Sequence, residues 1–284
     1  ISFYHSLWIQ VKPKKKQAKK VVMIPDKLPN TKVPQRHQVP NFSKDPPKQD
    51  EPDPLSDENR ALAEPLITLF GESVVAMAFS SAWACKVNGF QKLCDLIKGL
   101  KTPKEKISAF KSMMPLIRMR FSEGHKAVYC SAVENTKQLI ESIELQSNDF
   151  GNFIHQILPL VISRLGDSNQ KIDESARNFA FWSIERDKFA FQEIVQYALK
   201  QPAPNQYHLW IAKLNIIKVL IEKYGLDQGG KVSSQDVMKI VVPCLSSRKA
   251  EVRQSAFDIL LQIYPILGDR IDKYLVNVPR IVKD

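Results

Sequence analysis

The stretch IDESARNFAFWSI, residues 172–184, decides the fold because its pattern returns in VRQSAFDILLQIY, residues 252–264. In both stretches apolar residues recur at the spacing of one face of a helix, so each predicts an amphipathic α-helix. The two stretches start 80 residues apart, and VYCSAVENTKQLI, residues 128–140, starts 44 residues before the first. A recurrence every 40 residues or so, as here, is typical of stacked helical repeats.

Helix start and stop signals divide the chain into units of this length. Thr102 followed by Pro103 is typical of a helix start, and Gly225 of a helix end. The predicted helix pairs are residues 62–100, 103–145, 149–186, 188–225 and 233–267, with a sixth unit starting at Asp269. We therefore predict an all-α protein, an α-solenoid of about five to six HEAT repeats.

The first part of the chain has a different composition. Residues 1–58 contain nine of the 18 prolines and no glycine, which favours an extended linker. The linker is basic at KPKKKQAKK, residues 12–20, and acidic at DEPDPLSDE, residues 50–58. We expect a linker over residues 1–58 and the repeat domain over residues 59–284. The lysine run either attracts an acidic surface or is a solvated linker or localisation signal.

Composition narrows the classes of function. The formal net charge of +11 indicates an acidic partner. Composition does not distinguish among nucleic acid, an anionic membrane and an acidic protein as that partner. No apolar run is long enough to span a membrane. The four cysteines and five histidines show no metal-ligand spacing, and the common catalytic motifs are absent from the sequence. We expect a non-enzymatic protein without catalytic residues, cofactor or metal.

The turns inside the helix pairs are predicted to line up along one edge of the solenoid. Four of the five turns end in basic residues, where the helix dipole favours acidic ones. A recurrent placement that costs local stability indicates binding. The alternative is that these are ordinary surface residues of a chain with 41 basic side chains. The basic residues are Lys86, Lys126, Lys171, Arg248 and Lys249.

Trp83 lies at the first of these turns, three residues before Lys86. A large aromatic side chain beside a charge is typical of an interface anchor. The alternative is that Trp83 covers the end of the core in the first repeat, since terminal repeats of solenoids need a cap. The residues alone favour neither interpretation.

The stretch WACKVNGF, residues 83–90, resembles the first turn of TOG domains, which are tubulin-binding HEAT arrays. The flanking stretches, DPLSDENRALAEPLITLFGESVVAMAFSSAW from Asp53 and QDVMKIVVPCLSSRKAEVRQSAFDILLQIY from Gln235, resemble the TOG domains of the centrosomal protein of 104 kDa family, found at ciliary tips. The resemblance covers roughly residues 53–278 and departs from the family at Ala82 and Ala84. The fourth turn, QPAPNQY, also lacks a basic residue at its tip.

The resemblance implies a paddle whose turn edge binds curved αβ-tubulin. It implies that Trp83 and Lys86 contact β-tubulin, that Lys126 and Lys171 are central contacts, and that Arg248 and Lys249 face α-tubulin. The excess of basic residues agrees with the acidic surface of tubulin.

We therefore expect a tubulin-binding module that acts at microtubule plus ends, at the ciliary tip or the centriole. The expected location is the cytoplasm and cytoskeleton, including the ciliary axoneme and basal body. Other ciliary-tip or centriolar proteins are expected to bind the linker or domains outside this chain, and no nucleic acid or membrane is expected as a partner. The alternative is a HEAT scaffold that binds nucleic acid or another acidic protein through its basic edge.

Overall fold

The computed structural model of the chain describes residues 52–227 and 232–276. The lysine run of residues 12–20 and all but the last residues of the predicted linker lie outside these ranges. Most of the described chain is α-helical. The helices are α1 (Asp57–Phe70), α2 (Glu72–Phe79), α3 (Trp83–Lys98), α4 (Pro103–Ser112), α5 (Met114–Phe121), α6 (Lys126–Ile143), α7 (Ser147–Ile162), α8 (Gln170–Ile184), α9 (Lys188–Leu199), α10 (Tyr207–Tyr224), α11 (Ser234–Leu245), α12 (Ala250–Leu267), the 3-10 helix η1 (Gly268–Ile271) and α13 (Asp272–Leu275).

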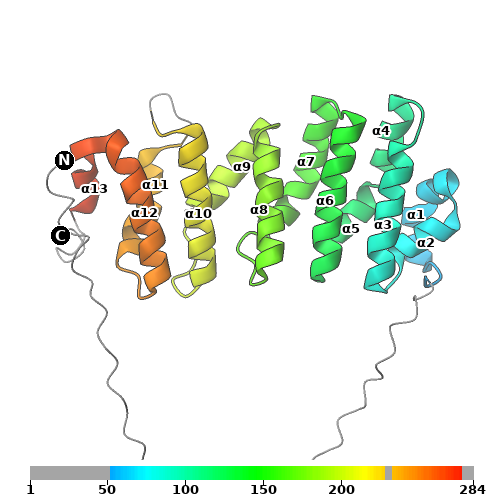
Figure 1. Cartoon of the computed structure of the whole chain (residues 1–284), viewed down its shortest axis with the longest axis horizontal. Helices are drawn as coiled ribbons and strands as arrows, with labels where there is room; N and C mark the ends of the chain where they lie inside the picture. The colour runs from blue at the N-terminus through cyan, green and yellow to red at the C-terminus, as the bar shows by residue number, and fades with distance from the viewer. Residues whose placement is uncertain (1–51, 228–231, 277–284) are drawn as a thin grey trace, which may run out of the picture. The chain divides into compact units, whose positions relative to one another are not determined.

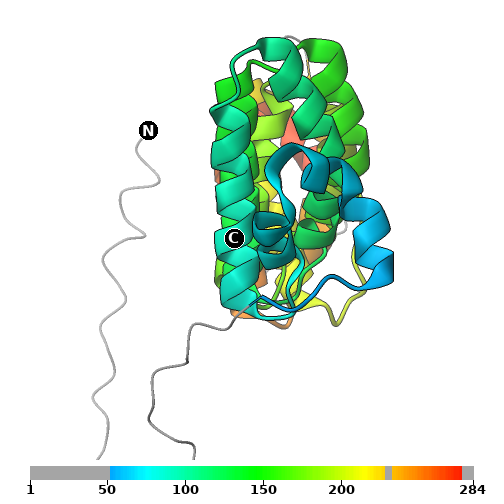
Figure 2. The same cartoon turned by 90° about the vertical axis from the view of Figure 1, so that its right-hand side faces the viewer.

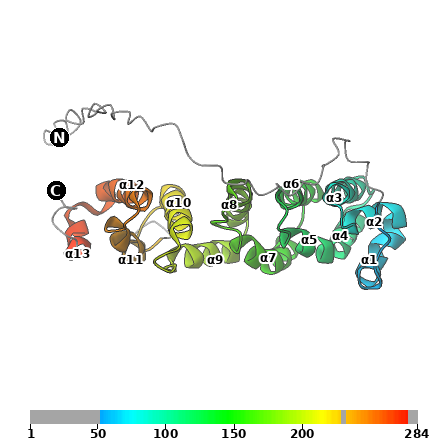
Figure 3. The same cartoon turned by 90° about the horizontal axis from the view of Figure 1, so that it is seen from below.

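The helices form two layers. One layer holds α3, α6, α8, α10 and α12 side by side, and the other holds α1, α4, α5, α7, α9 and α11 (Figures 1 and 3). Seen from the N-terminal end of this helical unit, α1 and α2 lie in front of the other helices (Figure 2). Each predicted pair contains one helix of the first layer together with the one or two helices that precede it in the chain, so the predicted solenoid of helical repeats is confirmed.

Two boundaries differ from the prediction. The first helix of the first repeat is divided at Gly71 into α1 and α2, and it begins at Asp57 and not at residue 62. It begins there because the Ser56 hydroxyl accepts a hydrogen bond from the Asn59 amide at 3.3 Å. The first helix of the second repeat is divided at Met113 into α4 and α5. Pro115 is the second residue of α5, and its missing N–H removes a helical hydrogen bond. Apolar spacing continues across the break, so periodicity alone predicted one helix.

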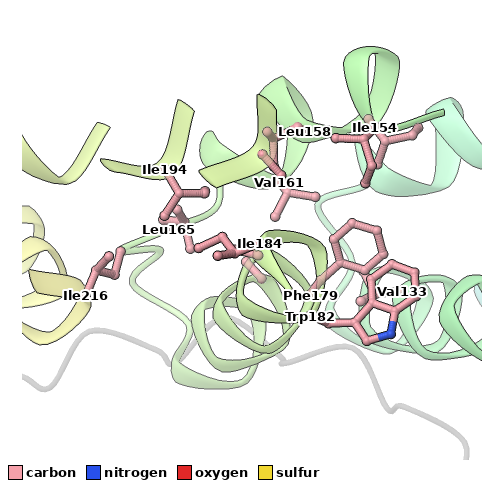
Figure 4. Packing of buried hydrophobic residues seen from close by; sticks show 14 of the residues in the cluster. Val133, Ile154, Leu158, Val161, Leu165, Phe179, Trp182, Ile184, Ile194 and Ile216 are labelled. Carbon is pink, nitrogen blue, oxygen red and sulfur yellow. The ribbon is translucent and has the colours of Figure 1, made fainter. Parts of the chain in front are cut away.

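The residues that defined the repeat are core residues. Ile172, Ala176 and Phe179 are at most 3% exposed, and Val252, Ala256 and Ile259 are at most 1% exposed. Figure 4 shows Phe179 and Trp182 of α8 beside Val133 of α6. Hydrophobic burial between successive repeats therefore stabilises the fold.

Gly89 permits the close packing of α3 against α2. A Cβ atom on Gly89 would lie 2.3 Å from the backbone nitrogen of Ala78, so no larger residue fits without a shift of the backbone. This contact fixes the position of α3 and of Trp83 at its start. Within the described ranges, no helix has both the length and the apolar character that a membrane span requires.

Candidate functional site

The turns between paired helices lie along one edge of the helical unit, the lower edge in Figure 1. We call this set of turns the turn edge: residues 80–82, 122–125, 163–169, 200–206 and 246–249. Every helix of the first layer starts at this edge, so its free backbone N–H groups point there. Residues at these helix starts therefore share one surface.

The first turn is held by Asp53. Its carboxylate accepts hydrogen bonds from the Ser81 amide at 2.8 Å and from the Ser80 hydroxyl at 3.2 Å. The hydrogen bonds from Ser81, and then that from Ser80, hold the pKa of Asp53 below its ordinary value. These hydrogen bonds therefore hold the backbone of the first turn in place immediately before Trp83.

Trp83 is the first residue of α3, and 53% of its surface is exposed. Its ring stacks on the imidazole of His125 with a centroid distance of 5.1 Å and an interplanar angle of 22°. His125 belongs to the second turn and is itself exposed. The indole is half exposed to solvent, and its stacking on His125 restricts its orientation.

Lys86 lies one helical turn further along α3, and its side chain is only 19% exposed. Its Nζ pairs with Oε1 of Glu123 at 2.7 Å. The same carboxylate oxygen accepts a hydrogen bond from Arg120, whose side chain is 2% exposed and whose Nη2 also donates to the Ala78 carbonyl at 2.9 Å. Burial lowers the pKa of Arg120, and the charge of Glu123 opposes that effect. Lys86 is therefore part of an ionic cluster that joins the first two turns.

The other predicted basic residues are exposed on the turn edge. Lys126 and Lys171 lie in the first turns of α6 and α8, and Arg248 and Lys249 lie in the fifth turn, immediately before α12. Among the described residues, none of these four takes part in an ion pair. Lys249 Nζ lies 5.3 Å from the centre of the Tyr207 ring. All six predicted residues thus lie on or next to one edge, and four of them carry a positive charge without a carboxylate partner.

Side chains of the following repeat donate hydrogen bonds to the backbone of two of the turns. Nη2 of Arg164 donates to the carbonyls of Ser122 and Glu123 in the second turn, both at 2.8 Å. The hydroxyl of Tyr197 donates to the carbonyl of Leu165 in the third turn at 2.8 Å. The turns are therefore held by neighbouring repeats and not only by their own backbone.

Sequence reasoning missed a cavity between the fourth and fifth turns. Its volume is about 590 Å³, and its walls include Pro202, Pro204, Tyr207, Trp210, Pro243 and Arg248. The prolines and aromatic residues of the fourth turn are its signal in the sequence, whereas the prediction for the turns rested on basic residues.

Other groups with reactive or metal-binding chemistry have structural surroundings. Burial raises the pKa of the Cys94 and Cys244 thiols to about 12, so both thiols are protonated near neutral pH. The ring of His155 packs on Phe189 with centroids 3.8 Å apart. Over residues 52–227 and 232–276, no cluster of His, Cys, Asp and Glu is arranged to hold a metal ion.

Comparison with known proteins gives consistent matches. Residues 60–259 match the family model described as the TOG domain of centrosomal protein CEP104. The mouse (Mus musculus) centrosomal protein of 104 kDa is 26% identical over an alignment of 225 residues, which covers 75% of this chain and 24% of the mouse protein. The chain thus spans about a quarter of the length of that relative.

Two solved structures share the fold. The TOG domain of human Cep104 is 22% identical, with a TM-score of 0.59 over 79% of this chain and 90% of the solved one. A structure described in terms of TOG–tubulin binding specificity is 16% identical, with a TM-score of 0.59 over 81% of this chain and 86% of the solved one.

Proposed function

The chain belongs to the family of CEP104 TOG domains, and from this premise we propose that it is a non-enzymatic module that binds curved αβ-tubulin through the turn edge. The observation that carries the proposal is the half-exposed Trp83 at one end of a row of unpaired basic side chains. A relative of this fold is described by its tubulin-binding specificity, which supports the choice of partner.

The proposed roles follow the order of the turns. Trp83 acts as the anchor on β-tubulin, because a large aromatic ring in a fixed orientation loses little entropy on binding. Lys126 and Lys171 are central contacts, and Arg248 and Lys249 face α-tubulin. Lys86 also faces β-tubulin, but it must exchange Glu123 for a carboxylate of the partner. We therefore expect a smaller contribution from Lys86 than from Trp83.

The proposed location is the cytoskeleton at the centriole and the ciliary tip, where the module would act at microtubule plus ends. The name of the relatives, a centrosomal protein of 104 kDa, supports the centriole. The ciliary tip and the plus end rest on the family resemblance of the sequence.

A test of the function compares the wild type with the double variant Trp83→Ala/Lys86→Ala for elution with free tubulin on a sizing column. We expect the wild type to elute with tubulin and the double variant to elute alone with unchanged helicity. Tyr264→Ala is the matched control, because Tyr264 is 50% exposed near the opposite end of α12. Elution of the wild type with duplex DNA but not with tubulin would refute the proposal and favour the nucleic-acid alternative.

A further inference from the structure

The cavity between the fourth and fifth turns has a mostly uncharged lining. Its walls combine the two prolines of the fourth turn with Tyr207 and Trp210 of α10, and Arg248 is the one charged residue among them. The larger cavity beside α8, of about 690 Å³, is instead lined by Glu134, Lys137, Lys171, Glu174, Glu185 and Lys223, among others. Of these two cavities, the smaller one is better suited to an apolar group.

Hydrogen bonds hold the walls of the cavity in place. Nε1 of Trp210 donates to the Ala203 carbonyl at 3.2 Å, and the Ala203 amide donates to the side chain of Gln206 at 3.1 Å. Gln201 ties the fourth turn to α11 through the Lys239 carbonyl at 2.9 Å. Nη1 of Arg253 donates to the Ser247 carbonyl of the fifth turn at 2.8 Å. A cavity built in this way needs little ordering when it binds a partner.

Two basic side chains lie at the cavity. Arg248 is exposed in its lining, and Lys249 lies over the Tyr207 ring. With no carboxylate in the lining, the charge fits a partner whose apolar side chain is followed by an acidic residue. The fourth turn, which lacks a basic residue of its own at its tip, would then contribute through burial of apolar surface.

We propose that this cavity receives an apolar side chain of tubulin, and that Arg248 at its rim pairs with a neighbouring carboxylate of tubulin. The inference rests on the proposed function and deepens it, because it divides the binding at this end of the edge into an apolar part and an ionic part. The apolar part is insensitive to salt, whereas the ionic part weakens as salt screens the charges.

The experiment measures the Kd for free tubulin at several salt concentrations. Tyr207→Ala removes one wall, and Ser247→Phe fills the cavity from the fifth turn. We expect each variant to weaken binding about tenfold without changing the salt dependence, as for truncation of an interface anchor. Tyr207→Phe keeps the ring and should bind like the wild type. Arg248→Gln should weaken binding and reduce its salt dependence.

Thermal unfolding of each variant checks the fold, and the filling variant tests the cavity even where Tyr207→Ala fails to fold. Wild-type affinity in both Tyr207→Ala and Ser247→Phe would overturn the inference and leave the proposed function standing. Equal salt dependence of Arg248→Gln and the wild type would overturn the ionic part. If the wild type itself does not bind tubulin, the proposed function fails and the inference falls with it.

Discussion

Glu123 is the central residue of the ionic cluster at the first two turns, and Glu123→Gln tests its energetic role. The substitution keeps the shape and one hydrogen-bond acceptor but removes the charge that faces Arg120, which is 2% exposed, and Lys86, which is 19% exposed. Removing one partner of a buried ion pair costs about 3–5 kcal/mol. Since Glu123 is 20% exposed and glutamine retains a polar contact, we expect a loss of about 2–4 kcal/mol in the free energy of unfolding.

The matched control is Glu185→Gln. Glu185 pairs with Lys223 of the next repeat, and the two residues are 38 apart in the sequence. The Lys86–Glu123 pair also joins two neighbouring repeats, with its residues 37 apart. Both side chains of the control pair are about half exposed, at 52% and 46%. Exposed pairs contribute about 0–1 kcal/mol, so the control should remain within about 1 kcal/mol of the wild type.

The assay is urea unfolding followed by far-ultraviolet circular dichroism, with the slopes of the transitions compared to confirm that each variant exposes the same surface. An effect of Glu123→Gln no larger than that of Glu185→Gln would refute the reasoning. It would mean that burial of Arg120 is compensated by its bond to the Ala78 carbonyl alone.

Three further predictions concern packing and pH. Gly89→Ala should destabilise the protein by about 2 kcal/mol or more, because the new Cβ atom meets backbone atoms of α2. Gly124→Ala should have little effect on the urea midpoint, because no atom lies within 4 Å of the new Cβ atom. Burial lowers the pKa of Lys213 from 10.5 to about 8, with a smaller effect of the charge of Lys200, so the unfolded chain binds more protons between these values. The wild type should gain stability relative to Lys213→Met as pH rises through that window, and a constant difference in unfolding free energy would contradict this. The lowered pKa of Asp53 stabilises the folded protein above the ordinary pKa of 3.8, and this stability is lost as pH falls through the pKa of the folded state. Asp53→Asn should therefore destabilise the protein at neutral pH but not in acid, as measured by thermal unfolding.

The repeat architecture was predictable because burial acts on local spacing. Ile172, Ala176 and Phe179 face the core through helical periodicity alone, and the second occurrence from Val252 gave the period. The same reasoning placed the turns and the exposed basic residues at helix starts. It did not detect the break at Met113, where apolar spacing continues across a backbone interruption.

The contacts of the site were less predictable because they join different repeats. Lys86 meets Glu123 across 37 residues, and, away from the site, Trp182 meets Glu141 across 41. The cavity at the fourth turn likewise needs residues from two repeats. Local periodicity carries no information on such pairs. A search for complementary residues one repeat apart would have found both polar contacts.

The hydrogen bonds between each turn and the next repeat limit how the module can be shortened. Arg164 holds the second turn from the third repeat, and Tyr197 holds the third turn from the fourth. Removing repeats from the C-terminal side would therefore alter the last turn that remains, even though its own sequence is intact. The distances between the proposed binding residues along the edge therefore depend on the whole stack of repeats. A truncated fragment would present the same side chains at a different spacing.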